Sequence, residues 1–201
     1  MFRALAISLG LGVSLICLEL VLRLSGLGYG HSPTIDHPVF HHWNPPDYSF
    51  RVWGPYDEYG GFDIRTNHDG FNMSRELPAA TEPSLIFLGD SFTFGGQVPE
   101  EERFVTIAAH ELVATALNFG NNSASALLSR LQLEYFADRI RPAAVIYQIY
   151  ANDIDDDQKM QRLGIRDAAG RIVAVPGDQF NWSVQLARQF YVVRLARMTY
   201  L

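Results

Sequence analysis

The sequence SLIFLGDS, residues 84–91, is a short apolar run that ends in a glycine and two small polar residues. Four consecutive apolar side chains without alternation predict a strand that is buried on both faces of a parallel sheet. The polar residues then fall at the carboxyl end of this strand, where open α/β sheets bind their ligands.

Two more strands and two helices are predicted downstream. Apolar spacing predicts a helix from about Arg103 to Leu117 and another over residues 123–140, which ends before Pro142. Residues 117–119 and 143–150 are short apolar runs that predict strands. The order strand, helix, strand, helix, strand is typical of a doubly wound parallel α/β sheet of the flavodoxin-like type.

The composition supports a folded domain and argues against nucleic-acid binding and against sites built from several cysteines. Of the 201 residues, 48% are hydrophobic and 19% are charged, which is too apolar for a disordered chain. The net charge of −6 leaves no basic excess for phosphate contacts, so nucleic acid is not expected as a partner. The single cysteine, Cys17, excludes an intrachain disulfide and a metal site of several cysteines.

Residues 4–22 are almost continuously apolar and follow Arg3. At 1.5 Å per residue the run approaches the ~30 Å hydrocarbon core of a bilayer, so it predicts a membrane anchor within residues 1–24. A cleaved signal peptide is the alternative, but no clear small-x-small motif precedes Leu24. We expect a single-pass cell-membrane protein with its domain on the extracytoplasmic side, because Arg3 favours an inside N-terminus, although Arg23 opposes it.

Residues 25–83 are rich in glycine, proline and aromatic side chains and show no regular periodicity. We expect an irregular segment that packs on the following domain, because its aromatic rings would be costly to leave in water; a ligand-facing lip is the alternative. These aromatic residues are Tyr48, Phe50, Trp53, Tyr56, Tyr59, Phe62 and Phe71. His37, His41 and His42 lack an acidic or histidine partner at ligand spacing, so no metal site is expected there.

A polar cluster follows each predicted strand. The clusters are Gly89-Asp90-Ser91-Phe92, Asn118-Phe119-Gly120-Asn121 and Asn152-Asp153. Ser91 is a candidate nucleophile, since a serine just past a buried strand presents its hydroxyl and its own N–H at the sheet edge. Gly120 allows close approach to the backbone, so its N–H is a second candidate donor, and the Asn152 carboxamide is a third. Three such donors around one oxygen would form an oxyanion hole.

Together, these clusters resemble the first three sequence blocks of the SGNH, or GDSL-type, hydrolase family, over roughly residues 84–157. The resemblance implies the same roles, with Ser91 as nucleophile and Gly120 and Asn152 as oxyanion donors. The segment 66–71 also looks like one that precedes the nucleophile block in membrane-anchored members. Each cluster alone is better explained by a helix cap or a tight turn, and it is the ordered set of three that favours the catalytic interpretation.

The aspartates near the third cluster have a local interpretation. Asp90 and Asp153 are expected to order loops by hydrogen bonds and are given no catalytic role. Asp155, Asp156 and Asp157 continue the acidic run, but the glycine turn and distant glutamate of a calcium loop are missing. A solvated helix start is therefore expected in place of a cation site.

The family resemblance implies a histidine base in an Asp-x-x-His block near the end of the domain, and the sequence contains no such block. The six histidines are His31, His37, His41, His42, His68 and His110. His110 is expected to be an ordinary helical histidine. Beyond the third strand the sequence predicts a short hairpin around residues 168–171 and an amphipathic helix over 183–198, which leaves no room for further strands. Residues 84–201 are thus expected to be the N-terminal portion of a longer hydrolase, or else a shortened protein that lost the base.

The sequence therefore predicts a serine acyl-ester hydrolase that uses neither cofactor nor metal and acts on a small or carbohydrate-borne ester. One alternative is an O-acetyltransferase that passes the acyl group to a cell-envelope polysaccharide. The other is a non-catalytic module that holds a glycan with the aromatic stretch 40–62. The sequence identifies neither the substrate nor the oligomeric state.

Overall fold

A computed structural model describes residues 2–25, 34–52, 62–177, 186 and 189–200. Its centre is a parallel sheet of three strands in the order β6-β5-β7, with β5 (Pro83–Gly89) between β6 (Ala116–Gly120) and β7 (Arg141–Tyr147). The registers align Gly89 with Gly120 and Leu88 with Tyr147. The expectation of an α/β structure with a parallel sheet is thus confirmed.

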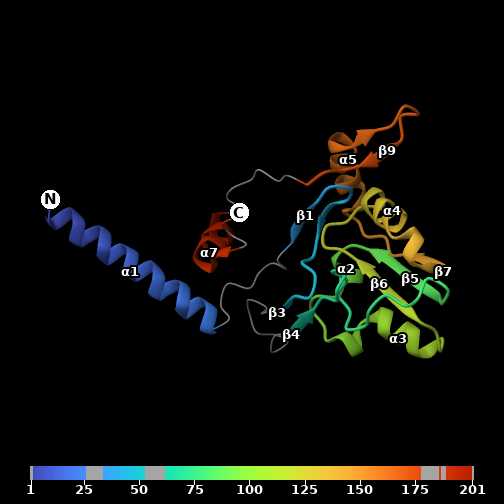
Figure 1. Ribbon diagram of the computed structural model, residues 1–201, viewed down its shortest axis with the longest axis horizontal. Coiled ribbons are helices and arrows are strands. Elements are labelled where there is room, and N and C mark those ends of the chain that lie inside the picture. Colours follow the sequence, from blue (N-terminus) through green and yellow to red (C-terminus); the bar gives the residue numbers. More distant parts are fainter. Residues whose placement is uncertain (1, 26–33, 53–61, 178–185, 187–188, 201) are drawn as a thin grey trace.

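The chain leaves the central strand β5 towards β6 on one side and then crosses back over β5 to reach β7 on the other side. Helix α3 (Phe104–Glu111) joins β5 to β6, and α4 (Ala126–Tyr135) joins β6 to β7 on the other side of β5. Because such crossovers are right-handed, the helices cover opposite faces of the sheet, as Figure 1 shows. This reversal creates a topological switch point beyond the carboxyl ends of β5 and β7.

Three predicted elements are shorter than expected, among them α4, which covers only residues 126–135 of the helix predicted over 123–140. Helix α3 ends at Glu111, six residues before the predicted end, because Val113 adopts a left-handed φ of 50° and residues 114–116 turn back into β6. Strand β7 ends at Tyr147, and the chain then bends so that the Tyr150 N–H donates to Asp153 Oδ2. The central strand is buried as predicted, with Ile86, Phe87 and Leu88 at most 5% exposed.

The residues after the sheet form helix α5 (Asp153–Leu163) and a hairpin of β8 (Ile165–Arg166) with β9 (Ile172–Ala174). The predicted hairpin around residues 168–171 is therefore confirmed. Helix α5 packs on α4, where Asp157 Oδ1 accepts a hydrogen bond of 2.8 Å from the Leu127 N–H. Ser125 caps the N-terminus of α4, since its hydroxyl accepts a hydrogen bond from the Leu128 N–H. Helix α7 (Tyr191–Tyr200) covers part of the predicted amphipathic helix, whose residues 183–185, 187 and 188 lie outside the described ranges.

The segment that precedes the sheet is more regular than predicted. It contains two antiparallel pairs, β1 (Ile35–His37) with β2 (His41–Trp43), and β3 (Ser49–Val52) with β4 (Phe62–Arg65). Short pairs of this kind lack the long apolar alternation from which strands are recognised. The sequence therefore predicted an irregular segment here, and the two pairs form sheets separate from the main one.

Aromatic side chains from this early segment complete the core of the domain. Phe40, Trp43 and Phe71 are at most 4% exposed, and the Phe71 ring lies 4.2 Å from the Phe119 ring of β6. Packing on the domain is thus observed for Phe71. Tyr48 is 39% exposed, so a larger part of it than of Phe71 is accessible to solvent. The remaining predicted aromatics, Phe50, Trp53, Tyr56, Tyr59 and Phe62, have side chains outside the described residues.

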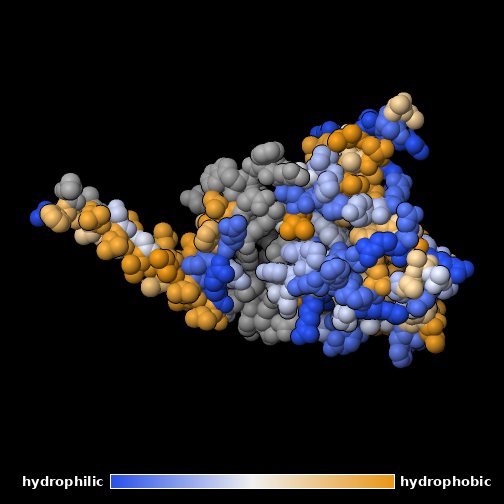
Figure 2. Space-filling model, viewed as in Figure 1, coloured by the Kyte–Doolittle hydropathy of each residue, from blue (hydrophilic) through white to orange (hydrophobic). Residues whose placement is uncertain are grey.

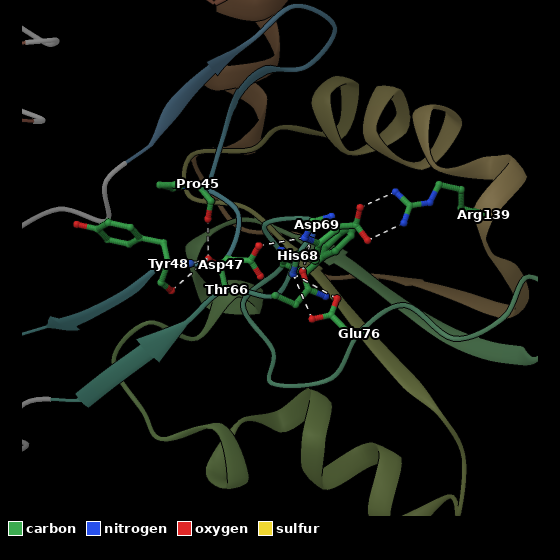
Figure 3. A network of polar contacts seen from close by, with 10 residues as sticks. Pro45, Asp47, Tyr48, Thr66, His68, Asp69, Glu76 and Arg139 are labelled. Carbon is green, nitrogen blue, oxygen red and sulfur yellow. Dashed lines mark hydrogen bonds and ion pairs between the residues drawn. The ribbon is translucent and has the colours of Figure 1, made fainter.

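Polar contacts around residues 66–71 join the early segment to the domain (Figure 3). Thr66 Oγ1 donates to the Pro45 carbonyl over 2.6 Å, and His68 Nδ1 lies 3.0 Å from Asp47 Oδ2. On the other side, Asp69 forms a bidentate ion pair with Arg139 of the short helix η2 (Ala137–Arg139). Residues 66–69 therefore contact both residues 45–47 of the early segment and Arg139 of the domain, which lie far apart in the sequence.

Helix α1 (Phe2–Ser25) projects from the rest of the structure, and its surface is almost entirely apolar (Figures 1 and 2). Its residues Leu5–Ser25 form the one helix among the described residues that is long and apolar enough to cross a membrane.

Candidate functional site

Ser91 is the first residue of the short helix α2 (Ser91–Phe94), directly beyond the carboxyl end of β5. Asp90 caps this helix, because its Oδ1 accepts a hydrogen bond of 2.9 Å from the Phe92 N–H. Ser91 is exposed, and within the described chain neither its hydroxyl nor its N–H makes a hydrogen bond. Asp90 thus fills the capping role that Ser91 would have in a purely structural turn, and the Ser91 hydroxyl is left for other chemistry.

The loops after β5 and β7 meet at the switch point. The Phe92 ring lies 4.3 Å from the Tyr150 ring, and these residues flank Ser91 and Asn152 along the chain. Burial raises the pKa of Asp90, and the nearby carboxylates of Asp153 and Asp156 raise it further. The first and third predicted clusters are therefore neighbours in space.

Asp153 holds the loop after β7 through hydrogen bonds to its carboxylate. It is 5% exposed, and its Oδ2 accepts a 2.9 Å hydrogen bond from the Tyr147 hydroxyl as well as the one from the Tyr150 N–H. Burial and this bond to Asp153 raise the pKa of Tyr147. Asp153 Oδ1 has no hydrogen-bond partner among the described residues. The carboxylate orders the loop, as the sequence predicted, although it is buried and not solvated.

Asn152 is exposed at the start of α5, beside this loop. Its Nδ2 donates to Asp156 Oδ2 over 2.7 Å. An amide nitrogen carries two hydrogens, so this bond leaves one donor for a ligand. Its neighbour Asp156 orients the carboxamide.

Gly120 has a different environment from the one predicted. Its N–H donates to Asn118 Oδ1 over 2.9 Å in the buried interior, so this donor is already used. A side chain at Gly120 would collide with the backbone of Thr93 and Phe94 in α2. The glycine therefore permits α2 to pack closely on β6, and this geometry speaks against Gly120 as an oxyanion donor.

The loop after Gly120 offers other backbone donors. The Asn121 N–H donates to the Gly89 carbonyl, which places this loop beside the start of α2. The N–H groups of Asn122 and Ser123 make no hydrogen bond in the described structure, and Ser123 has a left-handed φ of 57°. The sequence contains little signal for these donors, because an amide becomes available only through the conformation of its loop.

No histidine is hydrogen-bonded to Ser91 in the described part of the chain. His42 instead contacts the loop after Gly120, since its Nε2 lies against the Asn122 carbonyl and its Nδ1 lies 2.8 Å from His41 Nδ1. His37 stacks on Phe40, His68 faces Asp47, and His110 is exposed on α3. His31 lies outside the described residues. In the described ranges, no cluster of three or more histidine, cysteine or acidic residues could hold a metal ion.

No protein-family model matches the sequence, and no curated protein matches it.

Proposed function

We propose that Ser91 is the nucleophile of an SGNH-type acyl-ester hydrolase. The observation that carries this proposal is the state of Ser91, which is exposed at the switch point of a parallel sheet with its hydroxyl and N–H both unbonded in the described chain. A serine that served only as a helix cap would bond its hydroxyl to the backbone, but Asp90 makes that bond here.

The proposed oxyanion hole combines three loops. The Ser91 N–H is the first donor, and the free hydrogen of Asn152 Nδ2 is the second. The N–H groups of Asn122 or Ser123 replace Gly120 as the third, because the Gly120 N–H is bonded to Asn118. Loss of one oxyanion donor typically costs about 2.7–4 kcal/mol of transition-state stabilisation.

In the proposed reaction, the Ser91 oxygen attacks the ester carbonyl and the alcohol leaves, which gives an acyl-serine that water then hydrolyses. The serine proton requires a base, and none is bonded to Ser91 within the described residues. The described chain thus supplies the nucleophile and the oxyanion donors, and acylation in its isolated form is expected to be slow.

For the glycan-binding alternative, two rings of the stretch 40–62 are not available to a sugar. Phe40 and Trp43 are 1% and 4% exposed, so their rings cannot stack on a sugar. Transfer to a sugar hydroxyl uses the same acyl-serine as hydrolysis, and acylated sugar as product in place of free acid would indicate it. We further propose that α1 anchors the protein in the cell membrane, with the domain on the extracytoplasmic side.

Labelling with a serine-reactive fluorophosphonate tests the proposal. The reagent should modify the full chain, and Ser91→Ala should abolish the modification. Ser74→Ala is the matched control, because Ser74 is another exposed serine and its hydroxyl donates to Glu100 Oε1. Equal labelling of the parent and Ser91→Ala proteins would refute the nucleophile.

A further inference from the structure

Helix α7 is attached to the apolar helix α1 by a charged side chain. Glu19 Oε1 accepts a hydrogen bond of 3.1 Å from the Tyr191 N–H, and Oε2 accepts one of 2.9 Å from the Val192 N–H. Arg23 joins the same contact, since its Nε lies 2.7 Å from Glu19 Oε1 and its guanidinium lies 5.0 Å from the centre of the Tyr191 ring. Figure 1 shows α7 beside the end of α1 that leads to the domain.

The contact satisfies both a carboxylate in an apolar helix and the first N–H groups of α7. A carboxylate in an apolar helix is costly in lipid unless it is paired. The first N–H groups of a helix lack partners within that helix, and they carry a partial positive charge. Glu19 supplies acceptors to two such groups of α7, and Leu22, one turn along on the same face, is the only buried residue among the described side chains of α1.

The position of Glu19 sets the depth of this contact. Glu19 lies six residues before the end of the apolar span at Ser25, which corresponds to about 9 Å along the helix axis. Amphipathic helices that lie in the plane of a membrane bury their apolar face by about 5–10 Å. The contact with α1 therefore places the start of α7 at the boundary between headgroups and acyl chains.

The composition of α7 suits this boundary. Phe190, which directly precedes α7, and Leu195 within it are 43% and 38% exposed, so apolar side chains are available to lipid. The helix sequence contains Arg194 and Arg197 and no acidic residue. Basic residues of this kind favour a surface of anionic phospholipids.

We propose that α7 is an interfacial helix that lies in the anionic phospholipid surface and is held there by Glu19. The inference rests on the proposed membrane anchoring of α1. It adds a second membrane contact on the side of the domain, so that the domain is held against the bilayer by two helices.

Fluorescence quenching in vesicles tests this proposal with the full chain. Cys17→Ala removes the single cysteine, and a cysteine replaces one residue at a time for attachment of an environment-sensitive dye. Leu195→Cys reports α7, Leu11→Cys reports α1, and the exposed Val173→Cys of β9 is a control on the domain. The vesicles contain phosphatidylcholine and phosphatidylglycerol with a shallow spin-labelled lipid as quencher.

We expect quenching at positions 195 and 11 and none at 173. Glu19→Leu should reduce quenching at position 195 at least about twofold and leave position 11 unchanged, because α1 remains apolar while α7 loses its attachment. A dye at 195 that is not quenched, while one at 11 is, would overturn the interfacial helix alone. Absence of quenching at 11 would instead refute the membrane anchor, and an unchanged signal in Glu19→Leu would overturn the role of Glu19.

Discussion

The aromatic rings of Phe92 and Tyr150 lie 4.3 Å apart and join the loop that carries Ser91 to the loop that carries Asn152. Both rings remain partly exposed, at 55% and 45%. An aromatic pair of this kind contributes about 0.5–1.5 kcal/mol beyond area burial. A double-mutant cycle of Phe92→Ala and Tyr150→Ala, measured by urea unfolding in detergent, should give a coupling energy in this range. Strictly additive effects would show that the rings do not hold the loops together.

Gly120→Ala should destabilise the protein by about 1–3 kcal/mol, because the added methyl group collides with the α2 backbone at Thr93 and Phe94. The unfolding free energy measures this, with Trp43 as a buried fluorescent probe. Gly12→Ala is the control, since nothing lies within 4 Å of its added carbon. Unchanged stability of Gly120→Ala would mean that α2 and β6 pack less closely than described.

The bidentate pair of Arg139 with Asp69 predicts a specific cost for an apparently mild change. The guanidinium bonds both carboxylate oxygens, at 2.5 and 2.7 Å, and the Asp69 side chain is only 12% exposed. Arg139→Lys should lower the unfolding free energy by about 0.5–1.5 kcal/mol, because an ammonium cannot reproduce the fork. Arg162→Lys, at an exposed site on α5, should have no measurable effect. Equal stability of both variants in urea titrations would contradict this prediction.

His37 predicts an acid-sensitive stability. Burial lowers its pKa to about 4 from the ordinary value of 6.5, and its Nδ1 accepts from the N–H groups of Val39 and Phe40. The folded state thus binds fewer protons than the unfolded state between these values, so stability is full above pH 6.5 and is lost as the pH falls towards 4. The loss attributable to His37 should be about 2 kcal/mol, allowing for its partial exposure.

The matched variant for this pH dependence is His37→Asn. Its side-chain oxygen can accept the same backbone hydrogen bonds but does not titrate. Thermal melts between pH 4 and 7 should therefore show a shallower decline for His37→Asn than for the parent protein. Parallel curves would assign the acid sensitivity to other groups.

Features of the fold that depend on local pattern were predictable from the sequence. The apolar run at Leu85–Leu88 and the glycines that follow it and Phe119 indicated buried parallel strands, and β5 and β6 have these positions. The end of α3 was misjudged because the left-handed Val113 carries no sequence signature, unlike a glycine. The antiparallel pairs β1–β2 and β3–β4 were missed for a similar reason, since each is only three or four residues long.

The candidate site was predictable as a set of residue types but not in its hydrogen bonds. Ser91 and Asn152 follow neighbouring strands, so their place at one edge of the sheet could be inferred from topology alone. The partner of the Gly120 N–H could not, because Asn118 bonds to it through a side chain whose direction depends on the buried environment. In the same way, the cap that Asp157 provides for α4 joins residues that are far apart in sequence and depends on how α5 packs.

The central claim is that Ser91 is a nucleophile without a bonded base in the described chain. Its most direct test is the rate of fluorophosphonate labelling, mapped by mass spectrometry, as imidazole is added to supply an external base. We predict an adduct on the peptide that contains Ser91, formed at a rate that rises with imidazole concentration and absent from Ser91→Ala. An adduct on a different serine, or no adduct at any imidazole concentration in the folded protein, would contradict the claim.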